Sequence, residues 1–187
     1  MGRKKLILIL GGARAGKSLF AQELAKSLGE KVIFVATAEA LDEEMRERIE
    51  KHRQARPKSW RTLEAPKELA KNLKRELREE EVVVIDCLTL LLSNLMREKG
   101  EAREKIRQEI EELLDLFERS KASFIFVSNE VGMGIVPEYE LGRKYRDLLG
   151  EVNQFLARRA DKVYFLLAGL PLELKSISAS LRILRQA

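Results

Sequence analysis

The fold is decided by the stretch Gly11-Gly12-Ala13-Arg14-Ala15-Gly16-Lys17-Ser18. It matches the pattern GxxxxGK followed by Ser or Thr, in which glycines let backbone N–H groups turn toward an anion. A strand-like run precedes the stretch and a helix-like segment follows it, so the positive end of a helix dipole faces the same anion. The stretch therefore predicts a loop that cradles a polyphosphate. A chance glycine turn is the alternative, and the flanking strand and helix argue against it.

Outward from the loop, short apolar runs alternate with helix-like segments. The runs are rich in branched residues and lie at 5–10, 31–36, 82–85, 122–127 and 162–167. Because the amphipathic segments between them are long enough for helices, the alternation predicts crossover units and a buried parallel sheet. We therefore predict an α/β protein: a P-loop nucleotide-binding three-layer fold with a mainly parallel central sheet.

Two later segments carry apolar residues at the helical spacing. The first stripe consists of Ile106, Ile110, Leu113, Leu114 and Phe117. The second stripe consists of Leu141, Tyr145, Leu148, Leu149, Val152, Phe155 and Leu156. We interpret both stripes as core packing, with subunit contact as the alternative.

The length of 187 residues fits one domain, since single domains commonly contain ~100 to 200 residues. No internal repeat, low-complexity tract or proline-rich linker divides the chain, so we predict a single P-loop domain over 1–187. The last stretch, 176–187, follows no clear pattern and is a candidate tail.

The composition of the chain indicates its cellular compartment and the kind of partner it binds. The net charge of +5 suits an anionic partner, but the signs are mixed along the chain and nucleotide phosphates explain the balance as well as nucleic acid. Cys87 is the only cysteine, which excludes a disulfide within the chain and indicates a reducing compartment. The most apolar stretch, 82–96, is interrupted by polar residues and is shorter than the ~20 apolar residues of a membrane span. We expect a cytoplasmic protein with no membrane span.

Two residues are predicted to bind a metal ion, one in the loop and one at the end of a later strand. Lys17 is expected to reach the β- and γ-phosphates, and the Ser18 hydroxyl to coordinate Mg²⁺. The buried strand 82–85 ends at Asp86, and in a parallel sheet the strand ends open onto the ligand crevice. We expect Asp86 to hold the Mg²⁺ directly or through water. A cap on the following helix is the alternative for Asp86.

His52 is the only histidine and lies in the segment 42–54, which is predicted to be a helix that Asp42 caps. Met45, Ile49 and His52 share one face of it, and from spacing alone a histidine packed against the core is the better interpretation.

Positive charge around His52 favours a second interpretation. The cations near it are Arg48, Lys51, Arg53, Arg56, Lys58 and Arg61. Such a cluster is suited to hold a phosphate chain, and a solvated face is the alternative. A neutral imidazole can attack phosphorus and form a phosphoramidate, so the sequence permits this chemistry without proving it.

With these residues in view, the chain resembles the bifunctional adenosylcobinamide kinase/adenosylcobinamide-phosphate guanylyltransferase of cobalamin biosynthesis. The resemblance covers about 6–175 and includes the loop 11–18, the strings at 36–37, 42–45 and 48–52, and the strings at 56–57 and 60–62. The most family-specific string is Asn129-Glu130-Val131-Gly132-Met133-Gly134-Ile135-Val136-Pro137-Glu138. Its glycines make it a candidate lid that shields an intermediate from water, with a strand-to-helix turn as the alternative.

The resemblance implies that His52 is the histidine that becomes guanylylated, and His52 and Lys17 are the candidate catalytic residues. Relatives with a second, adjacent histidine carry it where this chain has Lys51. The implied GTP contacts are the loop Gly11 to Ser18, then Thr37, Ala38 and Glu39, then Arg53, Gln54, Ala55 and Arg56, and finally Glu64 and Asp86.

Two reactions are expected from the resemblance. Adenosylcobinamide is phosphorylated with ATP or GTP, and its phosphate then takes GMP from GTP through guanylylated His52, with Mg²⁺ as the cofactor. The products of the second reaction are adenosylcobinamide-GDP and pyrophosphate. The family also implies a homo-oligomer, with a trimer as the suggested form, and we expect no nucleic-acid partner.

Two other functions compete with this hypothesis. A monofunctional P-loop kinase for a small metabolite would not transfer a guanylyl group to His52. A nucleotide-dependent regulatory or nucleic-acid-binding module would show salt-dependent association and no turnover. The chain lacks a recognition-helix pattern and an aromatic stacking platform, which argues against nucleic acid.

Overall fold

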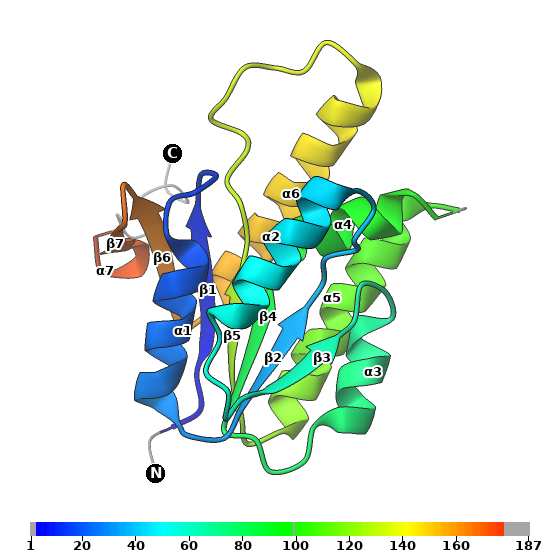
Figure 1. The fold of residues 1–187 in the computed structure, drawn as a ribbon. Coiled ribbons are helices and arrows are strands. Elements are labelled where there is room, and N and C mark those ends of the chain that lie inside the picture. Colours follow the sequence, from blue (N-terminus) through cyan, green and yellow to red (C-terminus); the bar gives the residue numbers. More distant parts are fainter. Residues whose placement is uncertain (1–2, 99, 178–187) are drawn as a thin grey trace.

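The computed structural model describes residues 3–98 and 100–177 (Figure 1). Its strands are β1 (Leu6–Gly11), β2 (Val32–Ala36), β3 (Arg61–Glu64), β4 (Val82–Asp86), β5 (Ser123–Val127), β6 (Lys162–Leu167) and β7 (Leu170–Glu173). Its helices are α1 (Lys17–Leu28), α2 (Glu43–Gln54), α3 (Leu69–Glu76), α4 (Leu88–Met96), α5 (Ala102–Arg119), α6 (Glu140–Arg159) and α7 (Leu174–Ile177). Each of the five predicted strands is present.

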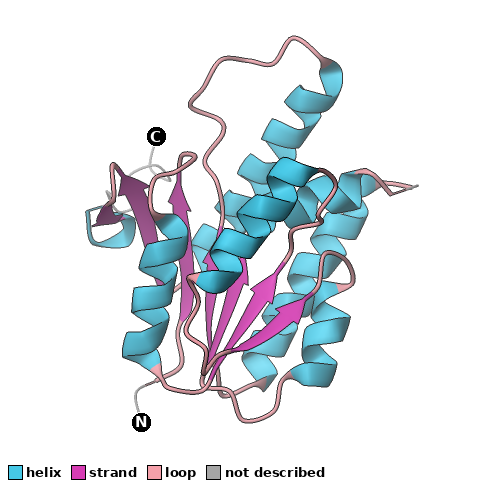
Figure 2. Ribbon diagram, viewed as in Figure 1, coloured by secondary structure: helices cyan, strands magenta, loops and turns pink. Residues whose placement is uncertain are grey.

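The seven strands form one sheet in the order β3-β2-β4-β5-β1-β6-β7. Every neighbouring pair is parallel except β6 and β7, which are antiparallel. Helices cover both faces of the sheet, which gives the three predicted layers (Figure 2). The predicted α/β fold with a mainly parallel central sheet is confirmed.

The sequence prediction missed the two edge strands, β3 and β7. The sequence of β3 is Arg-Thr-Leu-Glu, in which only Leu63 is apolar and no residue is buried, so it lacks the apolar run expected of a central strand. The strand β7 contains Pro171, which cannot donate to a ladder and is tolerated at an edge. It follows a two-residue turn in which Ala168 and Gly169 have positive φ of 50 and 84°, the geometry that joins antiparallel strands.

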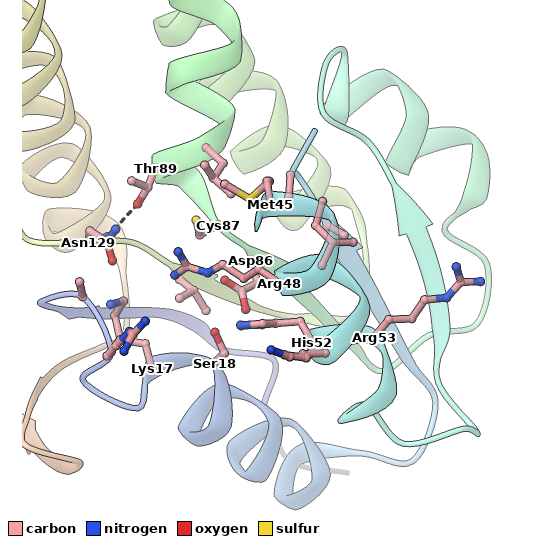
Figure 3. A pocket seen from close by; sticks show the side chains of 18 of the residues that line it. Lys17, Ser18, Met45, Arg48, His52, Arg53, Asp86, Cys87, Thr89 and Asn129 are labelled. Carbon is pink, nitrogen blue, oxygen red and sulfur yellow. Dashed lines mark hydrogen bonds between the residues drawn. The ribbon is translucent and has the colours of Figure 1, made fainter. Parts of the chain in front are cut away.

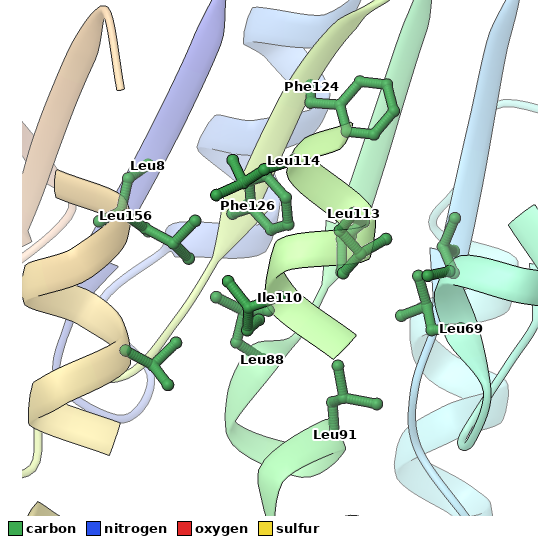
Figure 4. Close-up of a cluster of buried hydrophobic side chains, with 14 of the residues drawn as sticks. Leu8, Leu69, Leu88, Leu91, Ile110, Leu113, Leu114, Phe124, Phe126 and Leu156 are labelled. Carbon is green, nitrogen blue, oxygen red and sulfur yellow. The ribbon is translucent and has the colours of Figure 1, made fainter. Parts of the chain in front are cut away.

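Apolar side chains fill both faces of the sheet because successive strand residues point to opposite sides. In β1, Ile7 and Ile9 pack on the α1 side, with Ala21 and Ala25 of that helix. Leu6, Leu8 and Leu10 contribute to the larger cluster on the other face, where α3, α4, α5 and α6 lie (Figure 4). This packing holds the carboxyl ends of the strands in fixed positions.

The two predicted helical stripes differ in how completely they are buried. All five residues of the first stripe are buried on α5. In the second stripe, Leu148, Leu149, Val152 and Leu156 are buried, whereas Leu141 is 62% exposed. The assignment of Leu141 to the core was therefore wrong, because the first turns of α6 extend beyond the sheet (Figure 1).

Two further expectations concern the C-terminal stretch and membrane-spanning helices. Ser176 and Ile177, which the candidate tail included, belong to α7, and 178–187 lie outside the described residues. Among the helices that the structure describes, none is long and apolar enough to cross a membrane.

Candidate active site

A cavity of about 730 Å³ lies at the carboxyl edge of the sheet, between the loop 11–18 and α2 (Figure 3). The ends of β2, β3, β4 and β5 each contribute to its lining. Parallel α/β sheets place their ligands at this edge. The residues expected from the sequence that line it are Ala13, Arg14, Ala15, Gly16, Lys17, Ser18, Ala38, His52, Arg53, Arg56, Glu64 and Asp86.

The backbone of the loop depends on glycine at two positions. Gly16 precedes α1 with φ of 91°, in the left-handed region. Gly11 has φ of 152°, and a Cβ built on it would lie 2.6 Å from the Leu166 carbonyl oxygen of the neighbouring strand. Side chains at either position would be strained or obstructed. The glycines therefore let the chain turn from β1 into α1, whose N-terminus and its partial positive charge adjoin the cavity.

Lys17 is the first residue of α1 and is only 8% exposed. Its Nζ donates a hydrogen bond of 2.6 Å to the Gly12 carbonyl oxygen, within the loop. Burial lowers the pKa of Lys17, and the nearby Arg48 cation lowers it further, whereas Asp86 opposes the shift. A largely buried ammonium beside a second cation is stabilised by an added anion, and the triphosphate would supply it.

Asp86 ends β4 and has an unsatisfied oxygen. Its Oδ2 atom is buried and has no hydrogen-bond partner among the described residues. An unpaired carboxylate oxygen at depth is costly unless a cation or donor completes it. Both Asp86 and Ser18 line the cavity, and hard oxygen ligands of this kind fit Mg²⁺.

The described residues contain no group of three or more His, Cys, Asp or Glu side chains arranged to hold a metal ion. This agrees with the way Mg²⁺ is usually bound, through one or two protein oxygens together with substrate phosphates. A Mg²⁺ site at Ser18 and Asp86 stays a prediction.

Thr37 takes part in the structure behind the cavity and does not line it. The side chain is fully buried, donates a hydrogen bond of 2.7 Å to the Cys87 carbonyl oxygen and accepts one of 2.8 Å from the Cys87 N–H. Asn94 of α4 donates to the Thr37 carbonyl oxygen at 2.8 Å. These bonds fix the backbone after β2, so that Ala36 and Ala38 line the cavity.

The remaining expected contacts lie beside the cavity. Glu39 forms ion pairs with Arg97 at 2.7 Å and with Lys67 at 3.6 Å. Gln54 is exposed and donates to Glu50 at 3.0 Å, and Ala55 is the exposed C-cap of α2. Gly11 and Gly12 do not line the cavity but help to hold the loop in place. Gly11 lies close to β6, and the Gly12 carbonyl oxygen accepts the hydrogen bond from Lys17.

The helix α2 presents His52 to the cavity. Asp42 caps the helix as predicted, because its side chain accepts a hydrogen bond of 2.7 Å from the Met45 N–H. Met45, Ile49 and His52 are all half-buried and line the cavity together. The face predicted from the spacing is therefore confirmed, and it borders the cavity, not the hydrophobic core.

Arg56 follows α2 and packs against the sheet. Its guanidinium lies 4.0 Å from the centre of the Phe34 ring, and its Nε atom is buried without a hydrogen-bond partner among the described residues. Burial lowers the pKa of Arg56, while the Asp86 and Glu64 carboxylates oppose that shift. Stacking on an aromatic face fixes a guanidinium at modest cost and leaves its edge available to an anion.

Of two polar residues in the cavity wall, sequence reasoning gave Thr89 no role and named Asn129 only as part of the string that contains the candidate lid. The Asn129 N–H donates to Thr89 Oγ1 at 2.9 Å, and both residues line the cavity (Figure 3). From α6, Tyr145 donates to the Thr89 carbonyl oxygen at 3.1 Å and Asn153 to that of Asn129 at 3.0 Å. The only sequence signal for Thr89 is a hydroxyl inside an otherwise apolar run.

The loop after Asn129, expected to act as a lid, extends away from the sheet (Figure 1). Its side chains Met133, Ile135 and Val136 are 82, 97 and 57% exposed. Closure of this loop over the cavity stays a prediction.

The fold and the site together define a P-loop α/β nucleotide-binding protein. A solved structure of the RadB recombinase shares this fold with a TM-score of 0.52 and 14% identity, covering 86% of this chain and 73% of that one. The likeness extends to the fold alone. The particular family is given by sequence: the model of the cobinamide kinase/cobinamide phosphate guanyltransferase family, CobU, matches residues 7–174, and the chain belongs to this family.

Two relatives illustrate the relationship. The bifunctional adenosylcobalamin biosynthesis protein CobU of Escherichia coli (strain K12) is 40% identical over 181 residues, which cover 91% of this chain and 99% of that protein. The bifunctional adenosylcobalamin biosynthesis protein CobP of Pseudomonas aeruginosa (strain PAO1) is 45% identical over 168 residues, which cover 90 and 96%. The chain is therefore an enzyme of the family that combines the kinase and the guanyltransferase.

Proposed function

We propose that the protein phosphorylates adenosylcobinamide with ATP or GTP and then converts the product to adenosylcobinamide-GDP. One observation carries the proposal: the triphosphate loop and His52 line the same cavity. Because α2 borders the same cavity as the loop, a nucleotide whose β- and γ-phosphates bind the loop could present its α-phosphorus to His52. One triphosphate site can therefore serve both reactions.

In the kinase reaction, the hydroxyl of the aminopropanol arm attacks the γ-phosphorus. Phosphoryl transfer of this kind depends mainly on positioning and on charge stabilisation. Lys17 and the N-terminus of α1 supply positive charge where the γ-phosphate would lie. His52 has no role in this step.

In the guanylyl transfer, a ring nitrogen of neutral His52 attacks the α-phosphorus of GTP. The N–P bond forms while the bond from the α-phosphorus to the bridging oxygen breaks, and pyrophosphate leaves with that electron pair. A phosphate oxygen of cobinamide phosphate then attacks the same phosphorus. The N–P electrons return to the imidazole, which restores neutral His52 and releases adenosylcobinamide-GDP.

Ser18 and Asp86 are the residues that would hold Mg²⁺, and the unpaired buried Oδ2 atom of Asp86 supports this assignment. When bound, the ion neutralises negative charge on the phosphate oxygens. The surrounding residues bind and orient the nucleotide.

The proposal is tested with GTP labelled at the α-phosphate. The protein is incubated with it and Mg²⁺, denatured and separated from free nucleotide. We expect label in a bond that is labile to acid and stable to alkali, as a phosphoramidate is. A folded protein that phosphorylates cobinamide but never retains label would contradict the covalent step. The homo-oligomer implied by the family stays a prediction, for which light scattering is the measurement.

A further inference from the structure

The four Lys and Arg side chains of α2 fall into two groups: Arg46 and Lys51 lie beside carboxylates, whereas Arg48 and Arg53 have no ion-pair partner among the described residues. Arg46 forms an ion pair with Glu43, and Lys51 lies 4.0 Å from Glu47. Arg48 forms no ion pair and no hydrogen bond with any residue that the structure describes, and it lines the cavity. A guanidinium that has five donors and no partner, in the wall of a phosphate site, is available to an anionic ligand.

The position of Arg48 relates it to the nucleophile. Arg48 and His52 are four residues apart on one helix, so they lie on the same face one turn apart. Figure 3 shows the Arg48 side chain extending from α2 toward Asp86. Arg48 and Lys17 line the same cavity, and the Arg48 charge contributes to the lowered pKa of Lys17.

Arg48 therefore extends from the helix of the nucleophile toward the residues that hold the leaving group. We propose that Arg48 is a further catalytic residue for guanylyl transfer: it contacts the phosphate chain at the α–β bridge and stabilises the charge that develops on the departing pyrophosphate. The inference rests on the proposed function, because it concerns the step in which His52 displaces pyrophosphate. The electron pair of the broken P–O bond goes to pyrophosphate, beside the guanidinium.

Two other cations of the cavity, Lys17 and Arg56, are held by different parts of the structure. Lys17 belongs to the loop and faces the phosphates in both reactions. Arg56 is stacked on Phe34 and lies near Glu64. Lys51 and Arg53 lie on the same helix as His52 and also line the cavity, but Arg53 extends away from Lys17 and Asp86 (Figure 3). Of the cations of α2, Arg48 is the one that lies one helical turn from His52. A cation on the nucleophile's own helix should matter more for displacement at the α-phosphorus than for transfer of the γ-phosphoryl group.

The test compares Arg48→Ala and Arg48→Lys with Arg46→Ala. The control removes an exposed cation from the same helix that pairs with Glu43 and does not line the cavity. Three quantities are measured: the rate of label incorporation from α-labelled GTP at saturating nucleotide, the KM for GTP in that reaction, and kinase turnover with ATP. Thermal unfolding is recorded for each variant.

We expect Arg48→Ala to incorporate label roughly 10²-fold more slowly at saturation, the scale of losing one preorganised charge-stabilising group. Kinase turnover should fall much less, Arg48→Lys should recover part of the rate, and Arg46→Ala should match the wild type. Because α2 has no buried residue, all variants should unfold at the wild-type temperature.

Two results would overturn the role of Arg48. In one, folded Arg48→Ala incorporates label at the rate of Arg46→Ala; in the other, only the KM rises. A fall in both reactions that tracks a lower unfolding temperature in both Arg48 variants would also overturn it, since it indicates a structural role. Absence of label in the wild type is a distinct outcome, because it overturns the proposed function and this inference together.

Discussion

The two walls of the cavity are built in opposite ways. The loop wall, which consists of residues 11–18 with Asp86 and Cys87, continues two strands, β1 and β4, in which only Asp86 is not buried. The helix wall is α2, in which none of the described residues 43–54 is buried. The phosphate loop is thus anchored directly to buried strands of the core. The candidate nucleophile instead lies on a helix with no fully buried residue. Substitutions in the loop wall should affect both reactions, and substitutions in the helix wall only one.

The largest effect is expected for Lys17→Ala, in the loop wall. Loss of the ammonium removes charge neutralisation at the β- and γ-phosphates, so both reactions should fall by ~10³-fold or more. Kinase turnover and label incorporation are measured on the same preparation, with the unfolding temperature as the control for folding. Full turnover of either reaction by the folded variant would show that the loop wall does not serve both reactions.

His52→Ala should show whether the two walls serve different reactions. We expect guanylyl transfer to vanish, because the variant lacks the proposed nucleophile for the α-phosphorus, and kinase turnover to persist. Since His52 is half-buried on a helix without buried residues, the free energy of unfolding should change by less than about 1 kcal/mol. Both rates and thermal unfolding are measured. If the folded variant forms adenosylcobinamide-GDP at the wild-type rate, covalent catalysis by His52 is wrong.

Asp86→Asn tests whether the loop wall acts through a metal. The substitution keeps the shape of the side chain and removes its charge, so catalysis with Mg²⁺ should fall roughly a hundredfold, the scale of one charge-stabilising group. Nucleotide binding measured without metal should change much less. Equal losses with and without Mg²⁺ would instead assign Asp86 a structural role or a direct contact with the nucleoside.

The same contrast explains what the sequence could predict. The loop wall follows from local pattern, because a strand, a glycine turn and a helix are adjacent in the chain, and Asp86 follows its own strand. The helix wall is predicted less completely. Its capping residue and the shared face of Met45, Ile49 and His52 come from spacing. Which of its cations are already paired depends on side-chain conformation.

Contacts between distant segments account for most of the remainder. Thr37 is adjacent to a cavity residue in sequence, but its hydroxyl donates a hydrogen bond to the carbonyl oxygen of Cys87, fifty residues away. The stacking of Arg56 on Phe34 requires α2 to return over β2. The edge strand β3 is exposed, so its residues lack the apolar pattern by which buried strands are predicted. The assignment of one domain to 1–187 stays a prediction.

The smallest effect concerns Cys87, and it compares a thiol in the loop wall with one in the helix wall. Burial, followed by the neighbouring Asp86 carboxylate, raises the pKa of Cys87 to about 11. The thiolate is the form that reacts with iodoacetamide, so at pH 8 only on the order of one thiol in a thousand is reactive. Labelling of the native protein should be slow and should rise about tenfold per unit between pH 7 and 9.5.

The matched control is Arg46→Cys combined with Cys87→Ala, which moves the thiol to the exposed face of α2. That thiol should label at the rate of an ordinary exposed cysteine, and its rate should level off near pH 9 because an unshifted thiol is then mostly ionised. Wild-type protein unfolded in urea provides the same reference for Cys87. A native Cys87 whose labelling rate also levels off near pH 9 would mean that its pKa is not raised. In that case the loop wall is more open to water at Cys87 than its position beside the buried strand β4 implies, and the contrast between the walls would be confined to the phosphate loop itself.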